Sequence, residues 1–138
     1  MEALKTFPVL NSEIQGNELV FKHYYDIGVA ISTDDSLVVP VVRDADQKSF
    51  AEIESAIMDL ATRSRERKLA IQELQGGTFT ITNGGVFGSL MSTPLLNPPQ
   101  VGILGMHGFK PRPVAIDGQV VIRPVSYTHL TLPTSDLV

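Results

Sequence analysis

Short apolar or alternating stretches, each bounded by turn residues, recur along this chain and are typical of β-strands. They predict strands over residues 12–15, 18–22, 27–32, 37–42, 78–82, 101–105, 114–116 and 120–122. The two-residue turns Gly16-Asn17 and Asp117-Gly118 predict that the strands on either side of each turn form a hairpin. Because Pro40 has no backbone N–H, it predicts an edge or a bulge within residues 37–42.

Residues 49–68 carry the clearest helical pattern. The apolar residues that form one stripe along this helix are Ile53, Ile57, Leu60 and Ala61. Ser49 and Glu52 match a capping box at its start. The basic residues at its end complement the helix dipole, and phosphate binding is their functional alternative. A shorter helix over residues 1–7 is stopped by Pro8, and residues 70–74 predict one further turn.

The order of these elements is hairpin, strands, helix and then more strands. It predicts an α+β fold, a two-layer mixed-sheet sandwich, in place of a regular βαβ repeat. The clustered prolines Pro94, Pro98 and Pro99 exclude both a helix and a central strand, so residues 92–100 are expected to form a rigid, extended loop. A chain of 138 residues suffices for one core, in one domain or part of one.

The amino-acid composition and net charge of the chain argue against several classes of protein function. Apolar residues make up 43% and charged residues 19%, as in ordinary soluble proteins. The net charge of −4, without a basic stripe, argues against nucleic-acid binding. No apolar run approaches the ~20 residues of a membrane helix, and the first residues lack a signal-peptide layout. The absence of cysteine excludes disulfides, thiolate catalysis and cysteine metal sites.

The glycine-rich run over residues 76–89 is the strongest candidate for chemistry. The strand within it ends at Thr82, directly before the turn signal Asn83-Gly84. A hydroxyl beside bare backbone N–H groups suits the stabilisation of an oxyanion. The competing interpretation is an ordinary hairpin turn with a solvated threonine, and the local pattern alone favours it.

Histidines give no second candidate. His23, His107 and His129 lack metal-ligand spacing, and His23 and His107 have no acidic partner at a useful spacing, so both are expected to be structural. No P-loop or dinucleotide fingerprint is present.

Two longer segments, residues 26–44 and 76–107, carry a family resemblance. Together with their flanks, from about Glu2 to Pro124, they are similar to the catalytic domain of the E2 acyltransferases of 2-oxo acid dehydrogenase complexes. The runs Val86-Phe87-Gly88-Ser89-Leu90-Met91-Ser92-Thr93-Pro94 and Gly105-Met106-His107 most resemble the members that transfer succinyl groups in the 2-oxoglutarate dehydrogenase complex.

The resemblance implies a chloramphenicol-acetyltransferase-like, CoA-dependent acyltransferase fold, here incomplete at both ends. It implies trimers that build a larger cubic core of E2 subunits, with E1 and E3 components as partners of the parent protein. Coenzyme A is the implied substrate, the lipoyl group sits on a separate domain, and no metal takes part. A bacterial cytoplasm is the favoured location, with the mitochondrial matrix as the alternative.

The resemblance also gives Thr82 a role as the hydroxyl that hydrogen-bonds the oxyanion of the reacting thioester. It implies a histidine base from a later His-x-x-x-Asp-Gly motif, which meets the hydroxyl across a subunit interface. Coenzyme A contacts are not assigned by it.

The resemblance stops after Pro124. His129 does not fit the base position without a deletion, and Pro133 stands where the aspartate is expected. Residues 125–138 are therefore interpreted as a non-native, adapter-derived tail that packs poorly, and residues 1–124 as a partial catalytic domain. The chain alone is expected to be inactive.

Two alternatives remain open. The first is a non-catalytic structural member of a 2-oxo acid dehydrogenase core, which the missing histidine motif favours. The second is an unrelated α+β domain that binds a small ligand.

Overall fold

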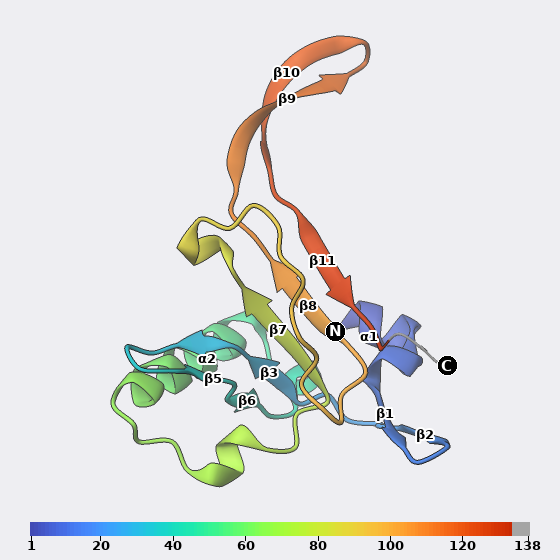
Figure 1. Cartoon of the computed structure of the whole chain (residues 1–138), viewed down its shortest axis with the longest axis vertical. Coiled ribbons are helices and arrows are strands. Elements are labelled where there is room, and N and C mark those ends of the chain that lie inside the picture. The colour runs from blue at the N-terminus through green and yellow to red at the C-terminus, as the bar shows by residue number, and fades with distance from the viewer. Residues whose placement is uncertain (134–138) are drawn as a thin grey trace.

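The computed structural model describes residues 1–133 and is built around a five-stranded mixed sheet (Figure 1). The strand order is β11–β8–β7–β3–β6. Their bounds are β3 (Ile27–Val29), β6 (Val41–Val42), β7 (Phe79–Asn83), β8 (Ile103–Met106) and β11 (Thr128–Thr131). Strand β7 runs parallel to both β3 and β8, whereas β6 and β11 pair antiparallel at the two edges. This mixed sheet with few helices confirms the predicted α+β class.

Both predicted hairpins are present. They are β1 (Ser12–Gln15) with β2 (Glu18–Phe21), and β9 (Lys110–Ile116) with β10 (Gln119–Val125). The second hairpin is longer than expected and projects away from the sheet (Figure 1).

The predicted strands over residues 27–32 and 37–42 are each broken into two shorter strands. The break within 37–42 was expected from Pro40, whereas the break within 27–32 was not predicted. Val29 N–H donates to Pro40 O, but Pro40 has no N–H to return. The ladder between β3 and β6 therefore stops there. It resumes as a separate two-stranded sheet of β4 (Ile31–Ser32) and β5 (Leu37–Val38).

Two helices pack against the central sheet, and their apolar side chains form the hydrophobic core together with those of the sheet. Leu4 of α1 (Glu2–Thr6) and Leu60 of α2 (Phe50–Arg65) are buried in one cluster with Ile27 and Phe79 of the sheet. The predicted capping box of Ser49 and Glu52 begins α2. The remaining turns are 3₁₀ segments at Pro8–Asn11, Ala45–Gln47, Ile71–Leu74 and Gly85–Phe87.

The C-terminal segment corrects one expectation. Thr128–Thr131 form β11, which pairs with β8 from Thr128 opposite Met106 to Thr131 opposite Ile103. The expectation of poor packing is therefore wrong for these residues, because β8 offers them an open strand edge. The last five residues of the expected tail lie outside the described residues.

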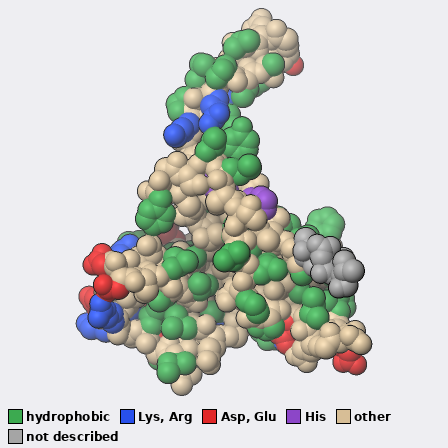
Figure 2. All heavy atoms as spheres, viewed as in Figure 1, with side chains coloured by type: hydrophobic (Ala, Val, Ile, Leu, Met, Phe, Trp, Pro, Cys, Tyr) green, Lys and Arg blue, Asp and Glu red, His purple; other side chains and the backbone are tan. Residues whose placement is uncertain are grey.

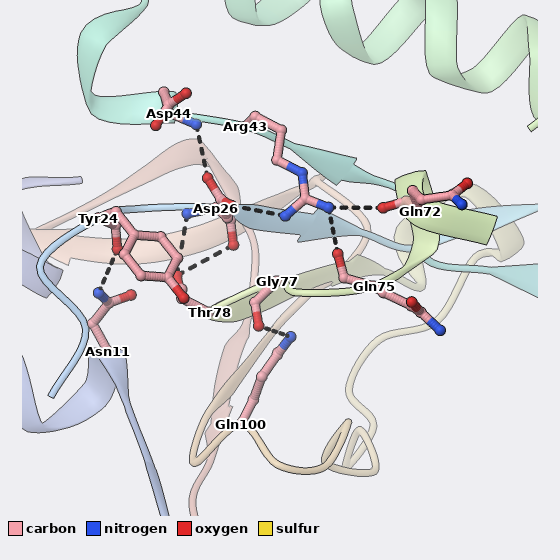
Figure 3. Close-up of polar contacts among 10 residues, drawn as sticks. All are labelled: Asn11, Tyr24, Asp26, Arg43, Asp44, Gln72, Gln75, Gly77, Thr78 and Gln100. Carbon is pink, nitrogen blue, oxygen red and sulfur yellow. Dashed lines mark hydrogen bonds and ion pairs between the residues drawn. The ribbon is translucent and has the colours of Figure 1, made fainter. Parts of the chain in front are cut away.

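A buried carboxylate ties together the ends of three strands (Figure 3). Asp26 Oδ2 accepts from Arg43 Nη1 at 2.8 Å, and its Oδ1 accepts from Asp44 N–H at 2.8 Å. Its backbone carbonyl accepts from Thr78 N–H at 2.6 Å, just before β7. Arg43 also donates to the carbonyl of Gln72 at 2.8 Å. This network fixes where β3, β6 and β7 begin or end relative to one another.

The Asp26→Ala variant is expected to lose about 2–4 kcal/mol of unfolding free energy, because Arg43 and the Asp44 N–H lose their buried acceptor. Urea denaturation followed by circular dichroism measures the loss. Asp35→Ala is the matched control, since it breaks the exposed Asp35–Arg67 pair and should cost under about 1 kcal/mol. Equal losses for the two variants would contradict a structural role for the Asp26 network.

Candidate functional site

Strand β7 presents its side chains to two different environments. Phe79 and Ile81 face the helices, where both line an apolar cavity with residues of α1 and α2. Thr80 and Thr82 face the opposite side, where the loop over residues 92–100 lies. The period of two predicted for this stretch is confirmed, and it brings Thr82 under the proline-rich loop.

The hairpin interpretation of Asn83-Gly84 is wrong. Gly84 has a φ of −79°, which is not the left-handed conformation of a two-residue hairpin turn. The chain instead enters the short 3₁₀ segment Gly85–Phe87 and returns through a long loop, so that β7 and β8 run parallel.

Five of the six backbone N–H groups over residues 84–89 already have an acceptor. Gly84 N–H donates to Met106 O at 2.9 Å, and Gly85 N–H donates to Asn83 Oδ1 at 2.8 Å. The N–H groups of Phe87, Gly88 and Ser89 all donate to carbonyls within the same turn. At these five positions the expected cradle of bare N–H groups is therefore absent, and the Thr82 side chain remains a candidate donor.

Thr82 is half-buried on the wall of a pocket of about 370 Å³. The lining is mainly apolar: Ala30, Leu37, Val39, Pro94, Leu95, Leu96 and Ile103, with Thr80, Thr82, Gly84, Ser92 and Asn97. The hydroxyl of Thr78, just before the strand, donates to Asp26 O, and the hydroxyl of Thr80 on the strand donates to Gln100 Oε1. Within residues 1–133 the Thr82 hydroxyl has no such partner, so it can donate to a ligand.

The pocket wall is locked by a contact that sequence reasoning missed. Thr80 is almost fully buried, and its hydroxyl donates to Gln100 Oε1 at 2.5 Å. The same amide donates through Nε2 to Gly77 O at 2.9 Å, as Figure 3 shows. Gln100 therefore joins the end of the proline-rich loop to β7. The one sequence signal that could have pointed to Gln100 is its position directly after the proline-rich segment.

A glycine in β8 lets the loop lie flat beside Thr82. Gly105 is the register partner of Thr82. A Cβ on Gly105 would come within 2.7 Å of Pro94 Cγ, closer than side-chain contacts normally allow. The ring of Pro94 therefore sits directly over the strand and closes one side of the pocket.

His107 holds the rim of the pocket, as expected for a structural histidine. It is almost fully buried, and its Nε2 accepts from the Ser92 N–H at 2.8 Å. A backbone amide can only donate, so the ring proton is on Nδ1, which donates to Tyr127 O at 2.8 Å. His107 thereby fixes Ser92, a residue of the pocket lining.

No acid or base lines this pocket among the described residues. His23 is exposed between β2 and β3. His129 lies opposite Gly105 in β11, so it shares a row and a sheet face with Thr82. Two strand spacings separate their Cα atoms by roughly 10 Å, and His129 is not among the residues that line the Thr82 pocket. Within one subunit His129 therefore lies outside the pocket at Thr82.

The remaining electrostatics do not add a reactive group at Thr82. In residues 1–133 no cluster of histidine or acidic side chains could hold a metal. A second pocket of about 370 Å³ adjoins the first at Val39 and Asn97 and contains the ion pair of Glu13 with Lys22 at 3.1 Å. A hydrogen bond from Gln15 and a weaker one from Lys22 lower the pKa of Glu13.

Among the helices within residues 1–133, none is long and apolar enough to cross a membrane.

Taken together, the site offers one unpartnered hydroxyl at the wall of a mainly apolar pocket. Such a group can stabilise developing negative charge on a carbonyl oxygen, but it cannot itself take a proton from a nucleophile. The arrangement offers a hydrogen-bond donor to an oxyanion and, within residues 1–133, no group beside it that takes up a proton.

Comparison with known proteins identifies the family of the chain. Residues 1–132 match the model of the family described as 2-oxoacid dehydrogenases acyltransferase (catalytic domain). The dihydrolipoyllysine-residue succinyltransferase component of the 2-oxoglutarate dehydrogenase complex from Rickettsia typhi is 59% identical over 95% of this chain. The chain spans only 33% of the length of that relative.

Solved structures show the same fold. A probable dihydrolipoamide acetyltransferase from Listeria monocytogenes superposes with a TM-score of 0.87 at 38% identity, over 94% of this chain and 54% of its own. The cubic core of a pyruvate dehydrogenase multienzyme complex superposes with a TM-score of 0.82 at 37% identity, over 93% and 52% of the two chains. The predicted acyltransferase fold is thus confirmed, and the chain belongs to the family of 2-oxoacid dehydrogenase acyltransferases, within their catalytic domain.

Proposed function

We propose that this chain is part of an acyltransferase that moves a succinyl group between the dihydrolipoyl thiol and coenzyme A in a 2-oxoglutarate dehydrogenase complex. The observation that carries the proposal is the unpartnered Thr82 hydroxyl, held on the wall of a mainly apolar pocket in a chain of this family. The choice of succinyl rests on the identity to the Rickettsia typhi succinyltransferase.

In this proposal Thr82 acts when a thiolate attacks the carbonyl carbon of the succinyl thioester. The carbonyl oxygen becomes an oxyanion, and the Thr82 hydroxyl donates a hydrogen bond to it. When the tetrahedral species collapses, the second thiol leaves as a thiolate and takes up a proton. The mainly apolar lining keeps water from the thioester and strengthens that hydrogen bond.

The attacking thiol needs a base, since an ordinary thiol has a pKa of about 8.5. The described residues supply no base at the pocket. We assign this role to the histidine of a His-x-x-x-Asp-Gly motif in the parent protein, brought to Thr82 by another subunit. Residues 1–124 are then a partial catalytic domain, and residues 125–138 are a non-native tail in our proposal.

The parent protein would carry its lipoyl group on a separate domain and use coenzyme A as a substrate. The lipoyl group supplies the thiol that carries the succinyl thioester. An unpartnered hydroxyl in a mainly apolar pocket fits the carbonyl group of such a thioester. The proposed partners are other copies in a trimer and a cubic core, together with E1 and E3 components, in a bacterial cytoplasm.

Recovery of the complete gene tests this function against a non-catalytic core protein. An in-frame His-x-x-x-Asp-Gly motif is expected after the codon for Pro124, because Thr82 has no base within residues 1–133. Sequencing the source DNA across that codon measures it, with the codons for residues 76–107 as the internal control. A gene that encodes residues 125–138 as they stand, and no such motif, would favour the non-catalytic alternative.

A further inference from the structure

Two threonine hydroxyls line the pocket proposed for the reacting carbonyl, and Gln100 engages one of them. Thr80 and Thr82 stand on the same face of β7, and both belong to the pocket wall. The Thr80 hydroxyl donates to Gln100 Oε1 at 2.5 Å, whereas the Thr82 hydroxyl has no partner within residues 1–133. The side chain of Gln100 therefore decides which hydroxyl of β7 is available to a ligand.

The orientation of the Gln100 amide follows from its second contact. The other end of the amide lies 2.9 Å from Gly77 O. A backbone carbonyl can only accept, so the NH₂ group faces Gly77 and Oε1 faces Thr80. An amide oxygen can also only accept, so the Thr80 hydroxyl must donate to it. The proton of Thr80 is thus committed to Gln100 and is not offered to the pocket.

Two glycines leave room for this chain of hydrogen bonds. A Cβ on Gly77 would come within 2.9 Å of Gln100 Nε2, and a Cβ on Gly28 within 3.0 Å of Thr80 Oγ1. Gly28 is the register partner of Thr80 in β3. Gln100 is 8% exposed and Thr80 is 1% exposed, so both bonds are shielded from water. A buried and satisfied polar network of this kind holds its members in one arrangement.

The loop over residues 92–100, which ends at Gln100, forms part of the pocket wall. It runs past β7 and β8 in Figure 1, and in Figure 2 hydrophobic side chains lie over the middle of the same view while charged ones lie mainly along the margins of the body. The Gln100 N–H donates to Asn97 O at 3.1 Å, and Gln100 also forms a bridge to Glu13 of β1. These contacts fix the end of the loop, and the Gln100 amide ties that end to β7.

We infer that Gln100 is a positioning residue for acyl transfer: it withholds the Thr80 proton and holds the loop on β7, so that Thr82 alone donates to the reacting carbonyl. The inference rests on the proposed role of Thr82 as the oxyanion donor. Gln100 touches no reacting atom and acts through Thr80 and the loop. Because turnover depends on the placement of the donor, a shift of about 1 Å in this wall can cost about 100-fold.

The variant Gln100→Glu tests the inference, because the two protonation states of the introduced carboxyl group predict opposite results. When protonated, the group reproduces both bonds: its carbonyl oxygen accepts from Thr80 and its hydroxyl donates to Gly77 O. When ionised, it has no proton for Gly77 O, and two acceptors face each other in a buried site. Burial raises the pKa of a carboxyl group above its ordinary value of about 4.3, so ionisation is expected between about pH 5 and pH 8.

The charged groups around Gln100 are the same in the wild type and the variant. Glu13 and Lys22 line the adjoining pocket and pair at 3.1 Å, and hydrogen bonds keep the pKa of Glu13 below its ordinary value. Near Gly77, Asp26 pairs with Arg43 at 2.8 Å. Their titration, and that of the base, therefore cancels in the ratio of the variant's turnover number to that of the wild type.

That ratio is measured for succinyl transfer by a protein that joins residues 1–124 to the segment that follows in the Rickettsia typhi relative. We expect the ratio for Gln100→Glu to lie within about threefold of one at about pH 5.5 and to fall at least about tenfold by about pH 8, with little change in the Michaelis constant. Gln100→Met keeps the length of the side chain but makes neither bond, so it should lose at least about tenfold equally at both pH values.

The matched control is Gln75→Glu, which places the same charge on an exposed glutamine of the pocket that Gln100 also lines. Its ratio should stay near one at both pH values. Equal losses in the two glutamate variants would overturn the inference, as would a Gln100→Glu ratio near one at about pH 8. A fall in thermal stability at that pH with wild-type turnover of the folded protein would make Gln100 structural only, which would overturn it too.

A second measurement separates this inference from the proposed function, since it needs no turnover. In the 138-residue chain, the backbone amide resonance of Thr82 in the Gln100→Glu variant should follow a titration between about pH 5 and pH 8 that is absent from the wild type. A Thr82 resonance without that titration would overturn the inference. A joined wild-type protein that folds but shows no turnover would instead contradict the proposed function, and the Thr82 resonance would still decide whether Gln100 positions this residue.

Discussion

Replacing Thr82 with valine is expected to lower the turnover number for succinyl transfer by about 10²–10³-fold, the usual cost of removing one oxyanion donor. The protein for this measurement joins residues 1–124 to the segment that follows in the Rickettsia typhi relative. Valine keeps the shape of threonine and removes only the hydroxyl. The effect should be large because the nearby N–H groups of Gly84 and Gly85 are already engaged and cannot take over.

The matched control is Thr82→Ser, which retains a hydroxyl at the same position and should keep turnover within about tenfold. The Michaelis constant for succinyl-CoA should change little in either variant, because the hydrogen bond forms in the transition state. A Thr82→Val protein with wild-type turnover would show that another group stabilises the oxyanion. A rise in the Michaelis constant alone would assign Thr82 to substrate binding.

Much of the framework is predictable because it depends on local physical rules. The capping box of Ser49 and Glu52, the apolar stripe of α2 and both two-residue hairpin turns appear where the sequence predicts them. The alternation over residues 78–82 also correctly predicts that Thr82 lies on one face of the strand, and Phe79 and Ile81 on the other. Each of these features follows from side-chain periodicity or turn chemistry within a few residues.

The pairing partners of β7 could not be predicted in the same way. Asn83-Gly84 resembles a hairpin turn, yet tertiary pairing with β3 and β8 overrides that local preference. The bonds that occupy the N–H groups of Gly84 and Gly85, and the link from Thr80 through Gln100 to Gly77, depend on neighbours brought together by the fold. The edge of β8, which accepts Thr128–Thr131, is likewise set by sheet order and not by local sequence.

The second large effect concerns the base. The 138-residue chain alone is expected to transfer no measurable succinyl group, because no acid or base among residues 1–133 lines the Thr82 pocket. In catalytic groups that act as a unit, loss of one member costs as much as about 10⁴–10⁶-fold in turnover. A base supplied on a joined segment should restore that factor without any change to residues 1–124.

The central proposal is that Thr82 supplies the oxyanion donor of an acyl-transfer site, and that the group that moves the proton is not among residues 1–133. The most direct test is a succinyl-CoA to dihydrolipoamide transfer assay on two purified proteins, the 138-residue chain and residues 1–124 joined to the following segment of the Rickettsia typhi relative. A third protein, the joined form with the motif histidine changed to alanine, serves as the control. We predict turnover by the joined protein and none by the other two. Turnover by the 138-residue chain itself, or none by a folded joined protein, would contradict the account.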